Sequence, residues 1–153
     1  MSTAKDRKYL VVVLTAAAIA LAGSTIAAVT LNQGASSSKI ITTDPNIGVY
    51  SDSACTNSLT SINWGSIEVG GSASQTIYIE DTGGTAMTPS ISVSNWSPST
   101  ACTYITLTWS TLPSSIGTGV SNAAAVTLTL TVSSSTPTSI TSFSNSITIS
   151  GTG

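Results

Sequence analysis

Hydrophobic and polar residues alternate one by one along much of the chain after residue 46. The clearest case is 126–132, where every second residue is a threonine between valines and leucines. The same period of two recurs at 77–79, 105–109 and 147–149. Strict alternation is typical of β-strands with one face buried and the other in water. After residue 31, no segment shows a persuasive helical period.

Seven strands are predicted from this pattern and from the turn residues between the alternating runs. Glycine pairs, prolines and serine-rich stretches separate the runs and are typical of turns. Many short alternating strands in one stretch favour two antiparallel sheets packed face to face. We therefore expect an all-β, immunoglobulin-like sandwich over residues 47–153, with strands at 47–51, 61–69 (with a break), 74–81, 88–94, 103–110, 124–134 and 142–150.

The amino-terminal part is a single apolar run, residues 9–31, with Lys5, Arg7 and Lys8 just before it. A cleaved signal peptide has this basic start, apolar centre and small-residue end. A retained anchor is the alternative, because the run has the roughly 20 apolar residues that span a bilayer. A third alternative is a pilin-type leader, whose apolar helix packs with those of other copies in an assembly. Each alternative places the rest of the chain outside the cytoplasm, so we expect an extracellular, cell-surface protein.

A short β-branched segment stands apart between the apolar run and the expected sandwich. Residues 32–38 form a small polar linker, and KIITT at 39–43 precedes Asp44 and Pro45. The expected organisation is therefore a signal or anchor at 1–31, a linker with this extra strand at 32–46, and the sandwich at 47–153. An unpaired strand is a liability unless something pairs with it. Donation to another copy and pairing within its own domain both remain open.

The composition excludes several classes of function. Only 10 of 153 residues are charged, none is histidine, and 55 are serine or threonine. Without histidine the commonest general base and metal ligand is missing, and with four cations phosphate-backbone binding is implausible. We expect neither an enzyme nor a cofactor, and no nucleic-acid partner. A surface with few charges suits an extracellular protein that contacts copies of itself.

Two cysteines, Cys55 and Cys102, lie in the exported part of the chain. In an oxidising compartment an even count predicts one disulfide. Such a cross-link would stabilise the fold by roughly 4 kcal/mol in the chain-entropy description. Two buried free thiols are the alternative, and two sulfurs without histidine fall short of a tetrahedral metal site.

Asn95, in Asn95-Trp96-Ser97, is the chain's single candidate for N-glycosylation. Export makes the modification plausible, whereas Pro98 directly after the sequon and a buried Trp96 would oppose it. Both outcomes remain open.

Lys39 is the one cation after residue 31. A buried lysine beside an asparagine or aspartate can form an isopeptide cross-link, for which Glu68 or Glu80 could move the proton. The alternative, which we favour, is a solvated lysine that protects an edge strand from aggregation.

Two further sets of acidic residues have alternative roles. Asp44, Asn46 and Asp52 carry oxygen ligands that suit Ca²⁺, but capping of turns explains them better. Glu68 and Glu80 could form a glycosidase pair only across a cleft, and a wet sheet face explains them better.

The residues also resemble known families. The stretch 62–96, INWGSIEVGGSASQTIYIEDTGGTAMTPSISVSNW, resembles a recurrent immunoglobulin-like pattern of extracellular and centrosomal domains. Over most of 47–153 the likeness is to small archaeal surface proteins with one apolar amino-terminal segment and one immunoglobulin-like domain. The blocks that carry it are GVYSDSACTN, SINWGSIEVG, SNWSPSTACTYITLTWS, VTLTLTVSSS and ITSFSNSITISGTG.

The resemblance implies a function. Some similar archaeal subunits polymerise into extracellular threads, in which the amino-terminal strand of each subunit completes the sandwich of the next. It therefore implies a pilus-like surface filament built from copies of this chain, with a donor strand at Lys39, Ile40, Ile41, Thr42 and Thr43. The alternative is a monomeric surface or adhesion domain that residues 9–31 hold in the membrane.

Overall fold

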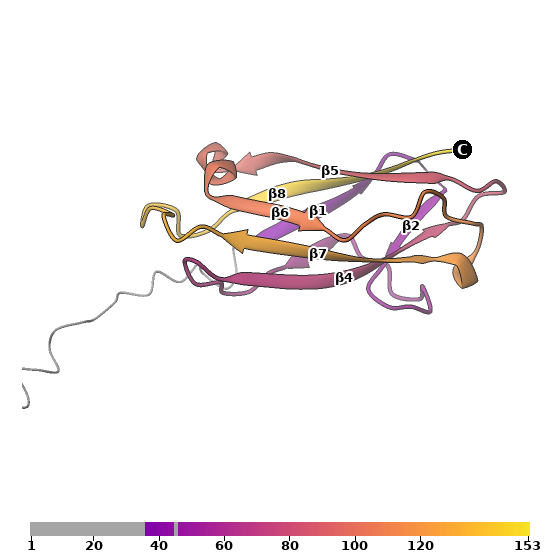
Figure 1. The fold of residues 1–153 in the computed structure, drawn as a ribbon, viewed down its shortest axis with the longest axis horizontal. Coiled ribbons are helices and arrows are strands. Elements are labelled where there is room, and N and C mark those ends of the chain that lie inside the picture. Colours follow the sequence, from indigo (N-terminus) through magenta and orange to yellow (C-terminus); the bar gives the residue numbers. More distant parts are fainter. Residues whose placement is uncertain (1–35, 45) are drawn as a thin grey trace, which may run out of the picture.

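The alternating segments form β-strands in a computed structural model of the chain, which describes residues 36–44 and 46–153. Figure 1 shows them stacked as two layers. Two short 3-10 turns, η1 (Ser99–Thr103) and η2 (Val120–Asn122), lie between strands. The strands are β1 (Ser37–Thr42), β2 (Ile47–Tyr50), β3 (Ser61–Asn63), β4 (Ser72–Asp81), β5 (Thr88–Ser97), β6 (Ile105–Trp109), β7 (Ala124–Val132) and β8 (Ser144–Thr152).

The two layers are four-stranded sheets, with strand orders β3-β1-β8-β5 and β2-β4-β7-β6. All pairings are antiparallel except that of β1 with β8, which is parallel over six residue pairs. The expected all-β sandwich is therefore confirmed. The described chain has eight strands rather than seven, because β1 belongs to the sandwich as well.

The core lies between the sheets and is built from every second residue of the long strands. In β7, Val126, Leu128 and Leu130 have no exposed surface, whereas the threonines between them face outward. Each such side chain contributes about 1.5–3 kcal/mol when it leaves water. Phe143 closes one end of the core, where its ring lies 5.8 Å from that of Trp96. The period of two in the sequence thus becomes one continuous apolar layer.

The expected strand at 61–69 is shorter than predicted and ends at Asn63. The Asn63 side chain accepts a hydrogen bond from the Gly65 N–H at 2.9 Å, and Gly65 has a φ of 67°. Only glycine adopts this left-handed conformation without strain, so the ladder stops there. Trp64 and Ile67 nevertheless reach the core, which explains why the stretch has the composition of a strand.

The sandwich begins at β1, earlier than the expected start at residue 47. Four of the five expected donor residues, Lys39 to Thr42, lie in β1 and pair within their own chain. Thr43 follows β1, and its N–H donates to the Ile149 carbonyl at 3.2 Å. Of the two alternatives that the sequence leaves open for this segment, the single chain adopts self-pairing.

The expected signal or anchor at 1–31 lies outside the described residues. Among residues 36–44 and 46–153, no helix has the length and apolar character to cross a bilayer.

Candidate functional site

The candidate site is the position that β1 occupies between β3 and β8, which we call the β1 slot. On one side Ser37, Ser38 and Lys39 pair with β3, and on the other all six residues of β1 pair with β8. The Ile40 N–H donates to the Thr60 carbonyl at 2.9 Å. Because β3 has no strand neighbour other than β1, β3 belongs to this sheet only while a strand fills the slot.

Alternate residues of β1 face the core. Ser38 and Ile40 are buried, whereas Lys39 and Thr42 are exposed. The indole N–H of Trp64 donates to the Ser38 hydroxyl at 2.8 Å, so this buried serine has a partner. Ile40 supplies the apolar anchor of the strand, and Ser38 fixes its register against Trp64.

The end of the slot nearest the amino terminus is lined by buried polar side chains, some of which lack hydrogen-bond partners. Among the described residues, Ser36 Oγ and both side-chain amide atoms of Asn145 are buried without a hydrogen-bond partner. Asn145 lies opposite Ser38 in the β1–β8 ladder. An unsatisfied buried polar group costs about 1–3 kcal/mol. The first half of β1 therefore has both of its ladders but leaves buried side-chain polar atoms without partners beside them.

A short connection joins β1 to β2 and crosses from one sheet to the other. The Asp44 carboxylate accepts a hydrogen bond from the Asn46 N–H at 2.9 Å, and the Asp44 carbonyl accepts one from Ile47 at 3.2 Å. This turn explains the spacing of Asp44 and Asn46, as the sequence predicts for turn capping. β1 thus reaches the rest of the fold through few residues.

The predicted disulfide is wrong within one chain, because Cys55 and Cys102 are both free. Cys55 lies in the loop between β2 and β3, whereas Cys102 lies in η1, at the opposite end of the sandwich (Figure 1). The Cys102 thiol donates instead to the Ser99 carbonyl at 3.1 Å. A disulfide needs its Cα atoms within about 7 Å, which spacing along the sequence cannot guarantee.

Asp52 organises the loop that carries Cys55. Its carboxylate accepts hydrogen bonds from the backbone N–H groups of Ala54, Thr56 and Asn57, the last at 2.7 Å. Slight desolvation opposes ionisation, but the hydrogen bonds from Asn57 and Thr56 prevail and lower the pKa of Asp52. Asp52 is therefore committed to its own loop and is not a partner of Asp44 and Asn46.

The thiol of Cys55 is held in its protonated form by its surroundings. Burial raises its pKa, and the nearby carboxylates of Glu80 and Asp52 raise it further. A raised pKa makes a thiol a poorer nucleophile at neutral pH. Cys55 therefore lacks the activation expected of a catalytic cysteine.

Asn95 is exposed near the end of β5, where the pairing of β5 with β8 is irregular. Its backbone has a φ of 54°, and its side-chain amide donates to the Ser146 hydroxyl at 3.4 Å. Trp96 is half-buried beside it. The asparagine is accessible as a glycosylation acceptor requires, and the modification stays a prediction.

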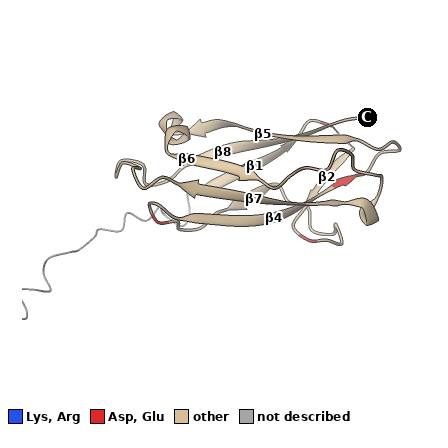
Figure 2. Ribbon diagram, viewed as in Figure 1, with Lys and Arg blue, Asp and Glu red and all other residues tan. Residues whose placement is uncertain are grey.

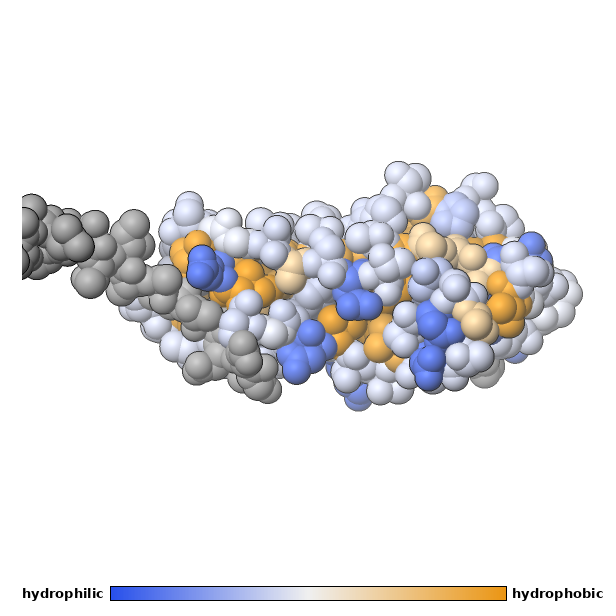
Figure 3. Space-filling view, turned by 90° about the horizontal axis from the view of Figure 1, so that it is seen from below, coloured by the Kyte–Doolittle hydropathy of each residue, from blue (hydrophilic) through white to orange (hydrophobic). Residues whose placement is uncertain are grey.

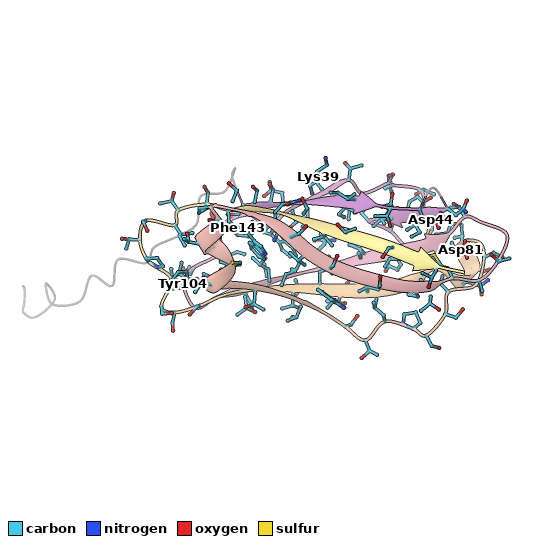
Figure 4. All side chains as sticks on the ribbon, turned by 90° about the horizontal axis from the view of Figure 1, so that it is seen from above. Lys39, Asp44, Asp81, Tyr104 and Phe143 are labelled. Carbon is cyan, nitrogen blue, oxygen red and sulfur yellow. The ribbon has the colours of Figure 1, made fainter. Side chains whose placement is uncertain are left out.

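The structure does not bring together the residues of the predicted isopeptide cross-link. Lys39 is exposed and projects outward from β1 (Figure 4), whereas Glu80 lies in the other sheet opposite Gly48. Glu68 is exposed before the start of β4. Such a cross-link needs a buried lysine, and Lys39 is exposed, so this disfavoured alternative is wrong. The favoured one is right about a solvated lysine but wrong about an edge strand, because β1 lies between β3 and β8.

The two glutamates are also too far apart to act as a glycosidase pair. Glu68 precedes β4, while Glu80 lies near the far end of that ten-residue strand. The Glu80 carboxylate lies beside the hydroxyl of Tyr50; burial and this contact raise the pKa of Tyr50. Figure 2 shows how thinly the charged residues are spread over the fold.

The surface offers few apolar anchors for a partner. Among the described residues, Val120 is the one large hydrophobic side chain that is exposed. In the face that Figure 3 shows, apolar areas are broken up by hydrophilic side chains. Outward-facing hydroxyls pair across strands, as do Ser74 with Thr129 at 3.0 Å and Ser90 with Ser150 at 2.6 Å.

Asp81 is a residue that the sequence reasoning missed. The expected strand at 74–81 ends with this residue, and in the structure its side chain points inward, in step with Ile77 and Ile79. Counting by twos along the strand would have placed its carboxylate at the edge of the core.

No family model matches the chain, and no curated protein or solved structure is significantly similar to it.

Proposed function

We propose that the chain is an extracellular structural subunit with an immunoglobulin-like sandwich, which polymerises into a surface filament by donating β1 to the next copy. The observation that carries this proposal is the β1 slot. A strand at the start of the sandwich completes one sheet, is the sole partner of β3 in that sheet, and pairs in parallel with β8.

Exchange of β1 preserves the contacts of the single chain. A second copy's β1 can place its Ile40 in the same core position and its Ser38 against the same Trp64 indole. Donation of β1 from each copy to the next is a head-to-tail contact, which propagates as an open filament. Short connections favour such swapping over closure within one chain.

The connection sets the geometry of the filament. Thr42 ends β1 and Ile47 begins β2, so an extended connection spans roughly 17 Å at most. Consecutive sandwiches must therefore touch end to end. The described residues carry one cation and five carboxylates, of which Asp44 lies in the connection itself, so few charges would be desolvated at that junction.

The alternative function is a monomeric surface or adhesion domain that residues 9–31 anchor in the membrane. It is favoured by the pairing of β1 within its own sheet, which leaves the slot of the single chain filled. The two proposals differ in one testable respect, the identity of the copy that supplies β1.

Cross-linking across the β1–β3 ladder tests the proposal. Lys39 and Ser61 lie directly opposite each other and are both exposed. In a Cys55→Ser, Cys102→Ser background, the full chain carrying Lys39→Cys and Ser61→Cys is assembled and treated with a short thiol-to-thiol cross-linker. We expect a ladder of multimers on a denaturing gel, because donor and acceptor belong to different copies.

The matched control carries Ser90→Cys and Ser150→Cys in the same background, since these residues pair between β5 and β8 within one body. This control should give internally cross-linked monomers whether or not the chain has been assembled. The proposal is wrong if the Lys39/Ser61 pair gives only monomers, or if the full chain forms no polymer.

A further inference from the structure

Asp81 poses a problem of buried charge at the end of the sandwich where β4 ends. Its side chain is 1% exposed. One carboxylate oxygen, Oδ1, accepts a hydrogen bond from the Gly83 N–H at 2.8 Å, and the other, Oδ2, has no partner among the described residues. A buried carboxylate is unfavourable unless it is paired, hydrogen-bonded or bound to a cation.

The Asn46 side chain lies next to this carboxylate. A Cβ atom built on Gly83 would lie 3.0 Å from Asp81 Oδ1 and 3.2 Å from Asn46 Cγ, so both side chains border the same space. The fit there is close, because even a Cβ atom at position 83 would press on both side chains. The Thr82 N–H donates to the Asn46 carbonyl at 2.8 Å and locks the two turns together.

Asp44 brings a second carboxylate to this end of the molecule. It lies two residues before Asn46 and is half-buried, and one of its oxygens accepts the Asn46 N–H. Figure 4 shows Asp44 and Asp81 at the same end of the sandwich. Lys39, the one cation in the described part of the chain, projects from the outer face of β1 and does not neutralise them.

We propose that Asp81, Asn46 and Asp44 bind one calcium ion. All three supply hard oxygen ligands, and two carboxylates balance the charge of a divalent cation. Within the described residues, no three or more His, Cys, Asp or Glu gather as a metal site, so the charged ligands of this site are its two carboxylates alone. Water and carbonyl oxygens must complete the shell, which Ca²⁺ accepts more readily than transition metals or Mg²⁺ do.

The ion would tie the connection after β1 to the turn after β4. Asn46 and Asp44 belong to the first, and Asp81 with Gly83 to the second. Bound calcium would therefore stiffen the segment from which β1 departs. The site depends on the sandwich alone and does not require that β1 be exchanged.

Calorimetric titration of the full chain with CaCl₂, after treatment with a chelator, tests the site. We expect one ion per chain with a dissociation constant of about 10⁻⁴–10⁻³ M, as for other extracellular modules, and weaker binding of MgCl₂. Saturating CaCl₂ should raise the melting temperature above that measured with the chelator.

Substitutions assign the ligands. Asp81→Asn should weaken calcium binding about tenfold or more, and Asp44→Asn, which leaves the core intact, should weaken it as well. Asp52→Asn is the matched control, because Asp52 serves its own loop, and it should bind as the unmodified chain does. The proposal is overturned if the unmodified chain shows neither binding heat nor a melting shift, or if Asp44→Asn and Asp81→Asn both bind normally.

Discussion

At the scale of single residues, a few polar groups, three of them buried and one in an exposed loop, decide what is specific about this fold. Ser38 is buried but receives the Trp64 indole N–H, and Asp52 satisfies three backbone N–H groups of its own loop. Asn145 and Asp81 keep buried atoms without partners among the described residues. Ser38 and Asp52 fix the local geometry. Asn145 lies beside the proposed donor strand, and Asp81 belongs to the proposed calcium site.

The loop around Asp52 should depend on pH. Because hydrogen bonds lower the pKa of Asp52 in the folded chain, its contribution to stability is present above the ordinary carboxyl value of 3.8. It is lost as pH falls through the lower folded value. The urea midpoint of the unmodified chain should therefore exceed that of Asp52→Asn at pH 6, and the gap should close below that ordinary value. A gap that stays constant with pH would contradict this role.

At the scale of elements, the alternating pattern predicts where strands lie, but not which strands or cysteines pair with each other. β4, β5, β7 and β8 lie within a few residues of their expected positions, because a period of two leaves little freedom. β3 ends early because Asn63 and Gly65 form a turn, a local effect that apolar composition hides.

The pairing of strands and of cysteines could not be predicted, because it depends on which segments lie close together in space. The parallel pairing of β1 with β8 joins segments about a hundred residues apart, and no local pattern encodes it. The same applies to Cys55 and Cys102, whose even count suggested a disulfide that the fold does not form. By contrast, the burial of Asp81 could have been predicted from the sequence, because it lies two residues after Ile79 and four after Ile77 on the same face of the strand.

Two neighbouring isoleucines test how β1 is held. Ile40 is 7% exposed and packs in the core, whereas Ile41 is half-buried on the other face. Ile40→Ala should reduce the free energy of unfolding by about 2–5 kcal/mol, because it leaves a cavity beneath β1. Ile41→Ala should cost less than half as much. Chemical denaturation measures both, and equal losses would show that β1 does not anchor the core through Ile40.

At the scale of the whole molecule, the proposed function depends on one strand. β1 completes a sheet that would otherwise lose β3, yet it is attached by the short turn around Asp44 and Asn46. If β1 is exchanged as we propose, this sandwich, with its few charges and outward-facing hydroxyls, acts as a building block. If β1 instead stays in its own chain, the protein fits the alternative of an anchored monomer.

The most direct measurement is an electron cryo-microscopy reconstruction of assembled protein in which the chain can be traced from β1 to β2. If β1 is donated, the strand beside β8 continues through residues 43–46 into a neighbouring sandwich, with its Ile40 in the core of the acceptor. A reconstruction in which each β1 continues into the β2 of its own sandwich would contradict the proposed donation.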